Sequence, residues 1–180
     1  MFSHVSLDAD EREHSLEMQL PYLAKIMEGK RFTLVPIIVG SINPRTEKEY
    51  GTFLSPYLED PRTAFVISSD FCHWGSRFSY TYYKRQLGEI WQFIEDLDHR
   101  GMKLIEDLEP EPFARYLSEE GNTICGRHPI GVFLNAVEAW RVKAPQLKFD
   151  LKFTRYAQSN HVKSMRDSSV SYASASLIVS

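Results

Sequence analysis

Two short apolar runs, FTLVPIIV at residues 32–39 and AFVI at residues 64–67, stand between longer segments whose apolar residues recur at helical spacing. A short, nearly continuous apolar run is typical of a strand that is covered on both faces. The segments at residues 87–108 and 129–142 instead place their apolar side chains along one side of a helix. Strands that alternate with helices along the chain predict an α/β layer fold.

The two ends of the chain extend this pattern. Residues 13–28 have helical spacing, which Pro21 interrupts or restarts. Residues 147–153 alternate between apolar and charged side chains, as a half-buried strand does, and residues 170–179 indicate a closing strand. The predicted fold is therefore α/β, with a mixed central sheet flanked by helices. Ligands of such folds gather at the carboxyl ends of strands, which directs attention to the polar residues after residue 67.

The chain has 180 residues, 43% of them hydrophobic, which predicts a single domain over residues 1–180 with a buried core. Its formal net charge is −3 and its basic residues do not cluster, which argues against nucleic acid as a partner. No apolar run approaches the roughly 18 residues of a membrane span. We therefore expect a protein of the cytoplasm without a membrane span, in which Cys72 and Cys125 are free thiols.

The segment SSDFCHWG, residues 68–75, directly follows the second apolar run. Its carboxylate and imidazole, at Asp70 and His73, are close enough along the chain to share a hydrogen bond, so Asp70 could orient His73 as a general base. The alternative is structural: Asp70 caps the next turn, and His73 is a satisfied polar residue beside Trp74. Spacing alone leaves both interpretations open.

A second candidate segment, NTICGRHP at residues 122–129, places Cys125 just before a predicted helix. A helix N-terminus and a nearby cation such as Arg127 stabilise a thiolate, which is both a nucleophile and a metal ligand. In the structural alternative Cys125 is a small buried thiol and His128 is an N-terminal cap.

The third candidate segment, EHSLEMQLP at residues 13–21, contains His14 at a helix start. His14 could point into a cleft, although a single histidine in this position is usually structural. Aromatic side chains also crowd the chain after Asp70, and they could wall a pocket or belong to the core. They are Phe71, Trp74, Phe78, Tyr80, Tyr82 and Tyr83.

Together, EHSLEMQLP, SSDFCHWG, NTICGRHPIG and the tail segments YAQS and DSSVSYAS closely resemble the Memo family. The resemblance implies an α/β fold similar to that of class III extradiol dioxygenases of the LigB type, which are non-haem iron enzymes. It implies that Cys125 is a metal ligand and that His73 and Asp70 line the same pocket as catalytic residues. Pocket positions are expected for His14, Trp74 and Arg127.

Members of this family also have an upstream region with two further histidine ligands, and nothing in this sequence matches it. The sequence therefore predicts a LigB/Memo-like domain that lacks its N-terminal strands. A thiolate beside imidazoles suits copper or iron better than magnesium or calcium, so copper or iron is expected in the full-length form. A stable metal site needs three or four ligands, which leaves dioxygenase activity of this chain an open question.

The resemblance implies a role in cell motility and cytoskeletal signalling, in the cytoplasm with the nucleus as a second location, through a redox-active pocket. The alternative is a non-enzymatic module that recognises a signalling protein or phosphopeptide with aromatic walls and Arg127. A third interpretation is hydrolysis by Cys125, with His73 or His128 as the base.

Overall fold

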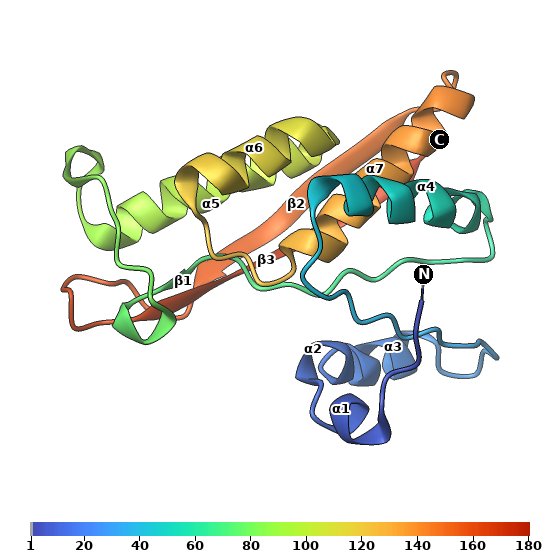
Figure 1. The fold of residues 1–180 in the computed structure, drawn as a ribbon, viewed down its shortest axis with the longest axis horizontal. Helices are drawn as coiled ribbons and strands as arrows, with labels where there is room; N and C mark the ends of the chain where they lie inside the picture. The colour runs from blue at the N-terminus through green and yellow to red at the C-terminus, as the bar shows by residue number, and fades with distance from the viewer. Residues whose placement is uncertain (1) are drawn as a thin grey trace. The chain divides into compact units, whose positions relative to one another are not determined.

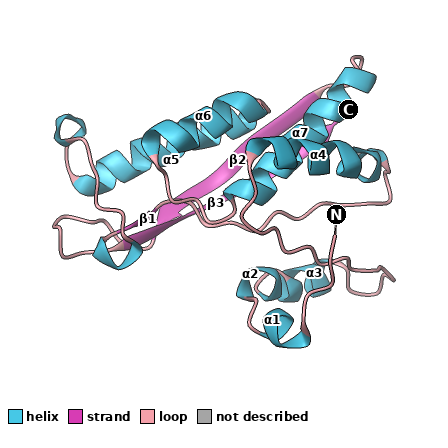
Figure 2. Cartoon of the chain, viewed as in Figure 1, coloured by secondary structure: helices cyan, strands magenta, loops and turns pink. Residues whose placement is uncertain are grey.

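The computed structural model describes residues 2–180, and the chain divides into two compact units, Met1–Gly40 and Ser41–Ser180. Figure 1 traces the chain, and Figure 2 separates its helices, strands and loops. That residues 1–180 form one domain stays a prediction.

The first unit consists of three short helices and an extended segment. The helices are α1 (Leu7–Glu11), α2 (His14–Glu17) and α3 (Leu20–Ile26). Pro21 lies in the first turn of α3, where its missing N–H has no intrahelical partner to lose. The predicted helix at residues 13–28 is therefore two helices, because the proline restarts the chain as a new helix.

Neither apolar run forms a strand, so these two predictions are wrong. Residues 32–39 and 64–67 have no regular secondary structure, and no sheet within residues 2–180 includes them. Val35 has 76% of its surface exposed, and Val66 is exposed as well. An apolar run becomes a buried strand only where neighbouring strands accept and donate its backbone hydrogen bonds, and the described part of the chain supplies none.

The sheet forms at the C-terminal end of the sequence, from strands β1 (His73–Trp74), β2 (Phe149–Gln158) and β3 (Ser169–Val179). Its order is β1-β3-β2 and both pairings are antiparallel, so the expected mixed sheet is corrected to an antiparallel one among the described residues. The predicted strands at residues 147–153 and 170–179 are confirmed as the long β2–β3 pair. The α/β fold class is also confirmed.

Four longer helices complete the second unit. They are α4 (Pro44–Glu59), α5 (Ile90–Glu106), α6 (Pro110–Glu120) and α7 (Arg127–Lys143). Two 3-10 turns, η1 (Ser76–Phe78) and η2 (Arg85–Leu87), lie between β1 and α5. The pairs α5–α6 and α4–α7 lie along the β2–β3 pair (Figure 1).

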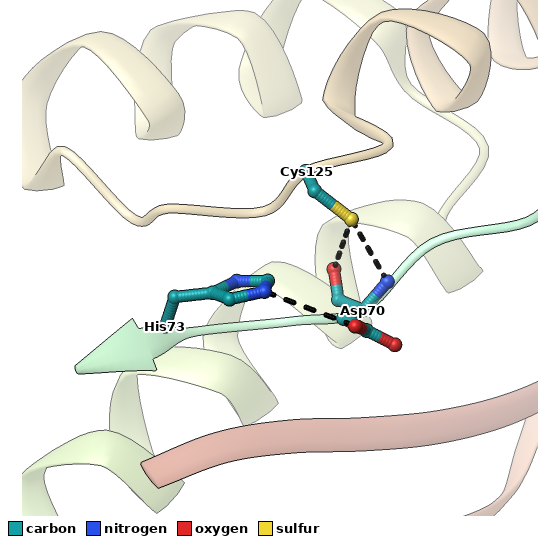
Figure 3. A group of neighbouring side chains, drawn as sticks. All are labelled: Asp70, His73 and Cys125. Carbon is teal, nitrogen blue, oxygen red and sulfur yellow. Dashed lines mark hydrogen bonds and ion pairs between the residues drawn. The ribbon is translucent and has the colours of Figure 1, made fainter. Parts of the chain in front are cut away.

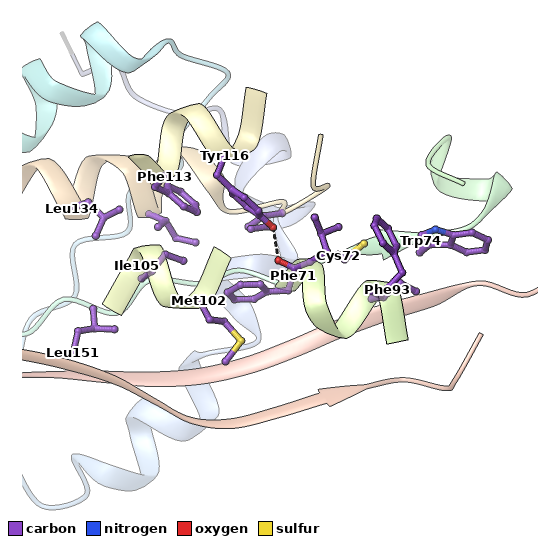
Figure 4. Close-up of a cluster of buried hydrophobic side chains, with 14 of the residues drawn as sticks. Phe71, Cys72, Trp74, Phe93, Met102, Ile105, Phe113, Tyr116, Leu134 and Leu151 are labelled. Carbon is purple, nitrogen blue, oxygen red and sulfur yellow. Dashed lines mark hydrogen bonds between the residues drawn. The ribbon is translucent and has the colours of Figure 1, made fainter. Parts of the chain in front are cut away.

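The core lies between these helices and the sheet (Figure 4). Its fully buried side chains include Trp74, Phe93, Leu97, Ile124, Leu134 and Val137. Trp74 has no exposed surface, and its Nε1–H donates to Tyr82 O at 2.9 Å. The ring of Trp74 is therefore part of the core, and its predicted place in the pocket stays a prediction. Cys72 and Trp74 are both buried, so they fix the backbone on either side of His73.

Candidate functional site

Asp70, His73 and Cys125 lie together in the second unit, although 55 residues separate Asp70 from Cys125. One ligand atom of each residue lies within 4.8 Å of the other two. Figure 3 shows Asp70 on the chain that leads into β1 and His73 in β1 itself, with Cys125 on the loop opposite. The structure thus brings together the three residues that the sequence singled out, and their chemical roles stay predictions.

The sulfur of Cys125 is held against the backbone of Asp70. The N–H of Asp70 donates to Cys125 Sγ at 3.2 Å, and Sγ lies 3.8 Å from Asp70 O. Gly126 makes this approach possible, because a Cβ there would lie 2.6 Å from Ser69 Oγ and 2.7 Å from Ser68 O. Its N–H donates to Ser69 Oγ at 3.0 Å. Cys125 remains exposed, so its sulfur is accessible to a ligand.

Two backbone carbonyls orient the imidazole of His73. Its Nδ1 lies 3.0 Å from Phe71 O and 3.1 Å from Thr123 O. A carbonyl oxygen can only accept, so Nδ1 carries a proton, and in the neutral imidazole Nε2 then holds the lone pair. Nε2 is 3.8 Å from Asp70 Oδ2, which is too long for a hydrogen bond. The hypothesis that Asp70 orients His73 is therefore corrected: the carbonyls of residues 71 and 123 do so.

These three groups supply a thiol sulfur, an imidazole lone pair and a carboxylate oxygen facing one small volume. A histidine that binds a metal through Nε2 commonly donates its Nδ1–H to a backbone carbonyl, which is the arrangement at His73. Sulfur and imidazole ligands are preferred by copper, iron and zinc rather than by magnesium or calcium. The residues present therefore fit a transition metal.

Thr123 is a positioning residue for this imidazole. Its Oγ1 accepts from His73 N at 2.7 Å and donates to His73 O at 2.9 Å. Thr123→Val should lower the free energy of unfolding by about 1 to 3 kcal/mol, because it leaves a part-buried N–H without its acceptor. Denaturant titration measures this change, and nitrogen NMR of the imidazole reports its tautomer. Thr123→Ser keeps the hydroxyl and should retain both properties, whereas equal losses in the two variants would contradict the assignment.

A buried carboxylate that the sequence reasoning missed lies beneath the site. Asp98 accepts from Cys72 N at 3.2 Å, from Asn122 Nδ2 at 2.9 Å and from Tyr156 OH at 2.9 Å. Burial raises its pKa above the usual value, although these hydrogen bonds act in the opposite direction. Asp98 lies on the apolar face of α5, four residues after Ile94. A carboxylate among apolar residues at helical spacing was the signal in the sequence that could have identified it as buried.

Arg127 is not one of the residues whose ligand atoms are grouped around Cys125. Arg127 lines a separate cavity, where His128 Nδ1 lies 2.7 Å from Glu47 Oε1. His128 is therefore paired with a carboxylate. His14 begins α2 in the first unit, so its predicted place in the pocket stays a prediction.

Both cysteines are free thiols, as predicted. Among residues 2–180, no helix has the length and the apolar character that crossing a membrane requires. The location of the protein in the cell stays a prediction.

Comparison with known proteins gives consistent matches along the chain. The model of the family described as Memo-like protein matches residues 1–176. The chain is 50% identical to Protein MEMO1 of Homo sapiens and 52% identical to Protein MEMO1 of Xenopus laevis, each over 181 residues. Protein memo-1 homolog of Caenorhabditis elegans is 49% identical over 171 residues.

These alignments cover 99% of this chain for the two MEMO1 proteins and 94% for the nematode protein. They cover 60% of each MEMO1 protein and 49% of the nematode protein, so the chain spans about half to three-fifths of the length of these relatives. The match nevertheless includes all three residues of the site. The chain belongs to the family of Memo-like proteins.

Proposed function

We propose that Asp70, His73 and Cys125 form part of a redox-active transition-metal centre that binds copper or iron. The observation that carries the proposal is the convergence of the three ligand atoms within 4.8 Å. The Nδ1 hydrogen bonds of His73 support it, because they leave Nε2 free to bind a metal. Bound copper or iron would supply one-electron redox chemistry at this position.

Each residue of the site has a distinct part in this proposal. Cys125 supplies a soft sulfur ligand, which favours Cu(I) and Fe(II) over hard cations. His73 supplies a neutral nitrogen, and Asp70 supplies negative charge that offsets the charge of the metal. Stable metal sites have three or four ligands, and in the complete family proteins we expect further ligands from sequence that this chain does not match.

The cellular part of the proposal is a role in cell motility and cytoskeletal signalling in the cytoplasm. Membership of the Memo-like family supports it. The alternative of a phosphopeptide module with Trp74 and Arg127 as pocket walls has less support, because Trp74 is buried and Arg127 lines a different cavity. Metal-dependent signalling is therefore the function that we favour.

Metal titration of the 180-residue chain tests the proposal. We expect one Cu(I) or Fe(II) per chain under anaerobic conditions, measured by competition with a chromophoric chelator. Substitution of a residue that only hydrogen-bonds to a metal ligand typically weakens metal affinity about 10- to 100-fold. Cys125→Ala removes a ligand itself, so it should weaken the affinity by more than about 100-fold. His73→Gln should also weaken it, because the amide is a poorer metal ligand than imidazole.

The other cysteine provides a matched control. Cys72 has no exposed surface, and burial raises the pKa of its thiol well above the usual value, so it is a poor metal ligand. Cys72→Ala should therefore retain the metal. Undiminished binding by Cys125→Ala, or absence of binding to the unmodified chain, would contradict the proposed centre.

A further inference from the structure

Loops with an excess of cationic side chains form the end of the second unit beside β1. They comprise residues 76–89 and residues 159–168, which we call the cationic tip (Figure 1). The tip has five Lys or Arg and two Asp or Glu residues, a formal charge of +3, whereas the whole chain has −3. The fold therefore concentrates positive charge that is dispersed along the sequence.

Contacts at both ends of the first segment hold the two segments of the tip together. Gly75 precedes the first segment, and a Cβ there would lie 2.6 Å from Ser168 Cβ. Trp91 follows it, and its N–H donates to Val162 O at 3.1 Å. The Trp91 ring also stacks on His161, with 4.3 Å between the ring centroids. The cations of the two segments therefore share one part of the surface.

Most cations of the tip are available to an external anion. Lys84 is the exception, because it lies 3.0 Å from Glu120 Oε2. The other four are exposed and form no ion pair among residues 2–180. They are Arg77, Arg85, Lys163 and Arg166. The guanidinium of Arg77 stacks on Phe78, with Cζ 4.4 Å from the ring centroid, which leaves its N–H groups available.

The two carboxylates of the tip do not neutralise these cations. Asp167 Oδ2 accepts from Lys163 N at 3.1 Å and from Ser164 N at 2.9 Å, which orders the second segment. Glu89 Oε2 accepts from Trp91 Nε1 at 2.6 Å. Both carboxylates are therefore bound to N–H donors, and the positive field of the tip persists beside them.

Large apolar side chains are exposed among the cations. Tyr82 is 54% exposed, Leu87 is 39% exposed and Met165 is 51% exposed. Met165 stands between Lys163 and Arg166 in the sequence. Apolar side chains surrounded by cations are typical of surfaces that lie on anionic membranes, where the lipid covers the apolar groups and its headgroups attract the charges.

We propose that the cationic tip binds the surface of a membrane that contains anionic lipids. The four available cations contact the headgroups, and the exposed apolar side chains enter the boundary between headgroups and acyl chains. The loops project from one end of the unit, so they can approach a flat surface together (Figure 1). Leu87 and Met165 offer no ring on which a base could stack, which favours a membrane over single-stranded nucleic acid.

Co-sedimentation of the 180-residue chain with lipid vesicles tests the proposal. We expect binding to vesicles of one-third phosphatidylserine and two-thirds phosphatidylcholine. Vesicles of phosphatidylcholine alone should bind much less, because they lack the negative surface potential that attracts the cations. An increase in salt from about 0.1 to about 1 M should weaken binding to the anionic vesicles, because it shortens the screening length from about 10 to about 3 Å.

The double variant Lys163→Gln, Arg166→Gln removes two cations from the tip. Each cation near an anionic surface increases partitioning about fivefold, so this variant should bind about 20- to 30-fold more weakly. Lys48→Gln, Lys148→Gln is the matched control. It changes the net charge equally at two exposed lysines of the same unit, on α4 and immediately before β2. It should bind within about twofold of the unmodified chain, because these lysines lie outside the tip.

Met165→Ser tests the apolar part of the tip. We expect it to weaken vesicle binding by about fivefold, because it removes apolar surface that the lipid would cover. Val142→Ser is the control, since Val142 is 78% exposed near the C-terminal end of α7. It should leave binding unchanged. Thermal unfolding should be the same for all four variants, because each substituted side chain is exposed.

Three results would overturn the proposal. One is a failure of the anionic vesicles to bind the chain more than phosphatidylcholine vesicles do. Another is an equal loss of binding in the tip variant and in the variant of Lys48 and Lys148. The third is tighter binding of an acidic peptide or a single-stranded oligonucleotide that depends on Lys163 and Arg166 and displaces the vesicles, which would assign the tip to that partner.

Discussion

Asp98→Ala should lower the free energy of unfolding by about 2 to 4 kcal/mol, measured by denaturant titration. The carboxylate accepts hydrogen bonds from Cys72 N, Asn122 Nδ2 and Tyr156 OH in a buried region. Alanine leaves these donors without that acceptor and opens a cavity. The effect should extend to the site, because Cys72 precedes His73 and Asn122 precedes Thr123 in the sequence.

Asp98→Asn is the matched control, because it keeps the size of the side chain but never carries the charge. Burial raises the pKa of Asp98, so the folded chain binds a proton that the unfolded chain has lost. The free energy of unfolding therefore decreases as the pH rises from about 3.9, the pKa of an unfolded aspartate, to the higher pKa of the folded state. Asp98→Asn should show a flatter dependence over this window. An unchanged slope would contradict the assigned cause.

Trp74→Ala should lower the free energy of unfolding by about 3 to 5 kcal/mol, since it removes a large, fully buried side chain from the core. It also removes the donor to Tyr82 O. Thermal and denaturant unfolding measure the loss.

Tyr57→Ala provides the comparison, because Tyr57 is 55% exposed, and we expect a change within about 0.5 kcal/mol. A similarly small change for Trp74→Ala would show that the indole does not anchor β1.

The helices and the β2–β3 pair could be predicted because their signals are local. The apolar residues of 87–108 and 129–142 recur with the period of the helix, and residues 147–153 alternate with the period of the strand. Residues 32–39 and 64–67 could not be predicted in the same way. Whether an apolar run forms a strand depends on neighbours, and its own sequence does not contain that information.

The candidate site was predicted in part. Asp70 and Cys125 were recognised by residue type and sequence context, and the structure places their ligand atoms together. The carbonyl oxygens that orient His73 belong to the backbone of Phe71 and Thr123, and the identity of a residue does not reveal where its carbonyl points. The pair of Glu47 with His128, 81 residues apart, depends on how α4 and α7 pack.

The contact of Gly126 with Ser69 has a further consequence for ligand capture. It joins two loop segments that are far apart in sequence, and it does so through protein atoms alone. The conformational entropy of bringing Cys125 to Asp70 is therefore lost when the chain folds rather than when a ligand arrives. Binding of a ligand at Cys125 and Asp70 should therefore need little rearrangement of the two loop segments. The rate of binding should depend on diffusion and ligand exchange rather than on loop closure.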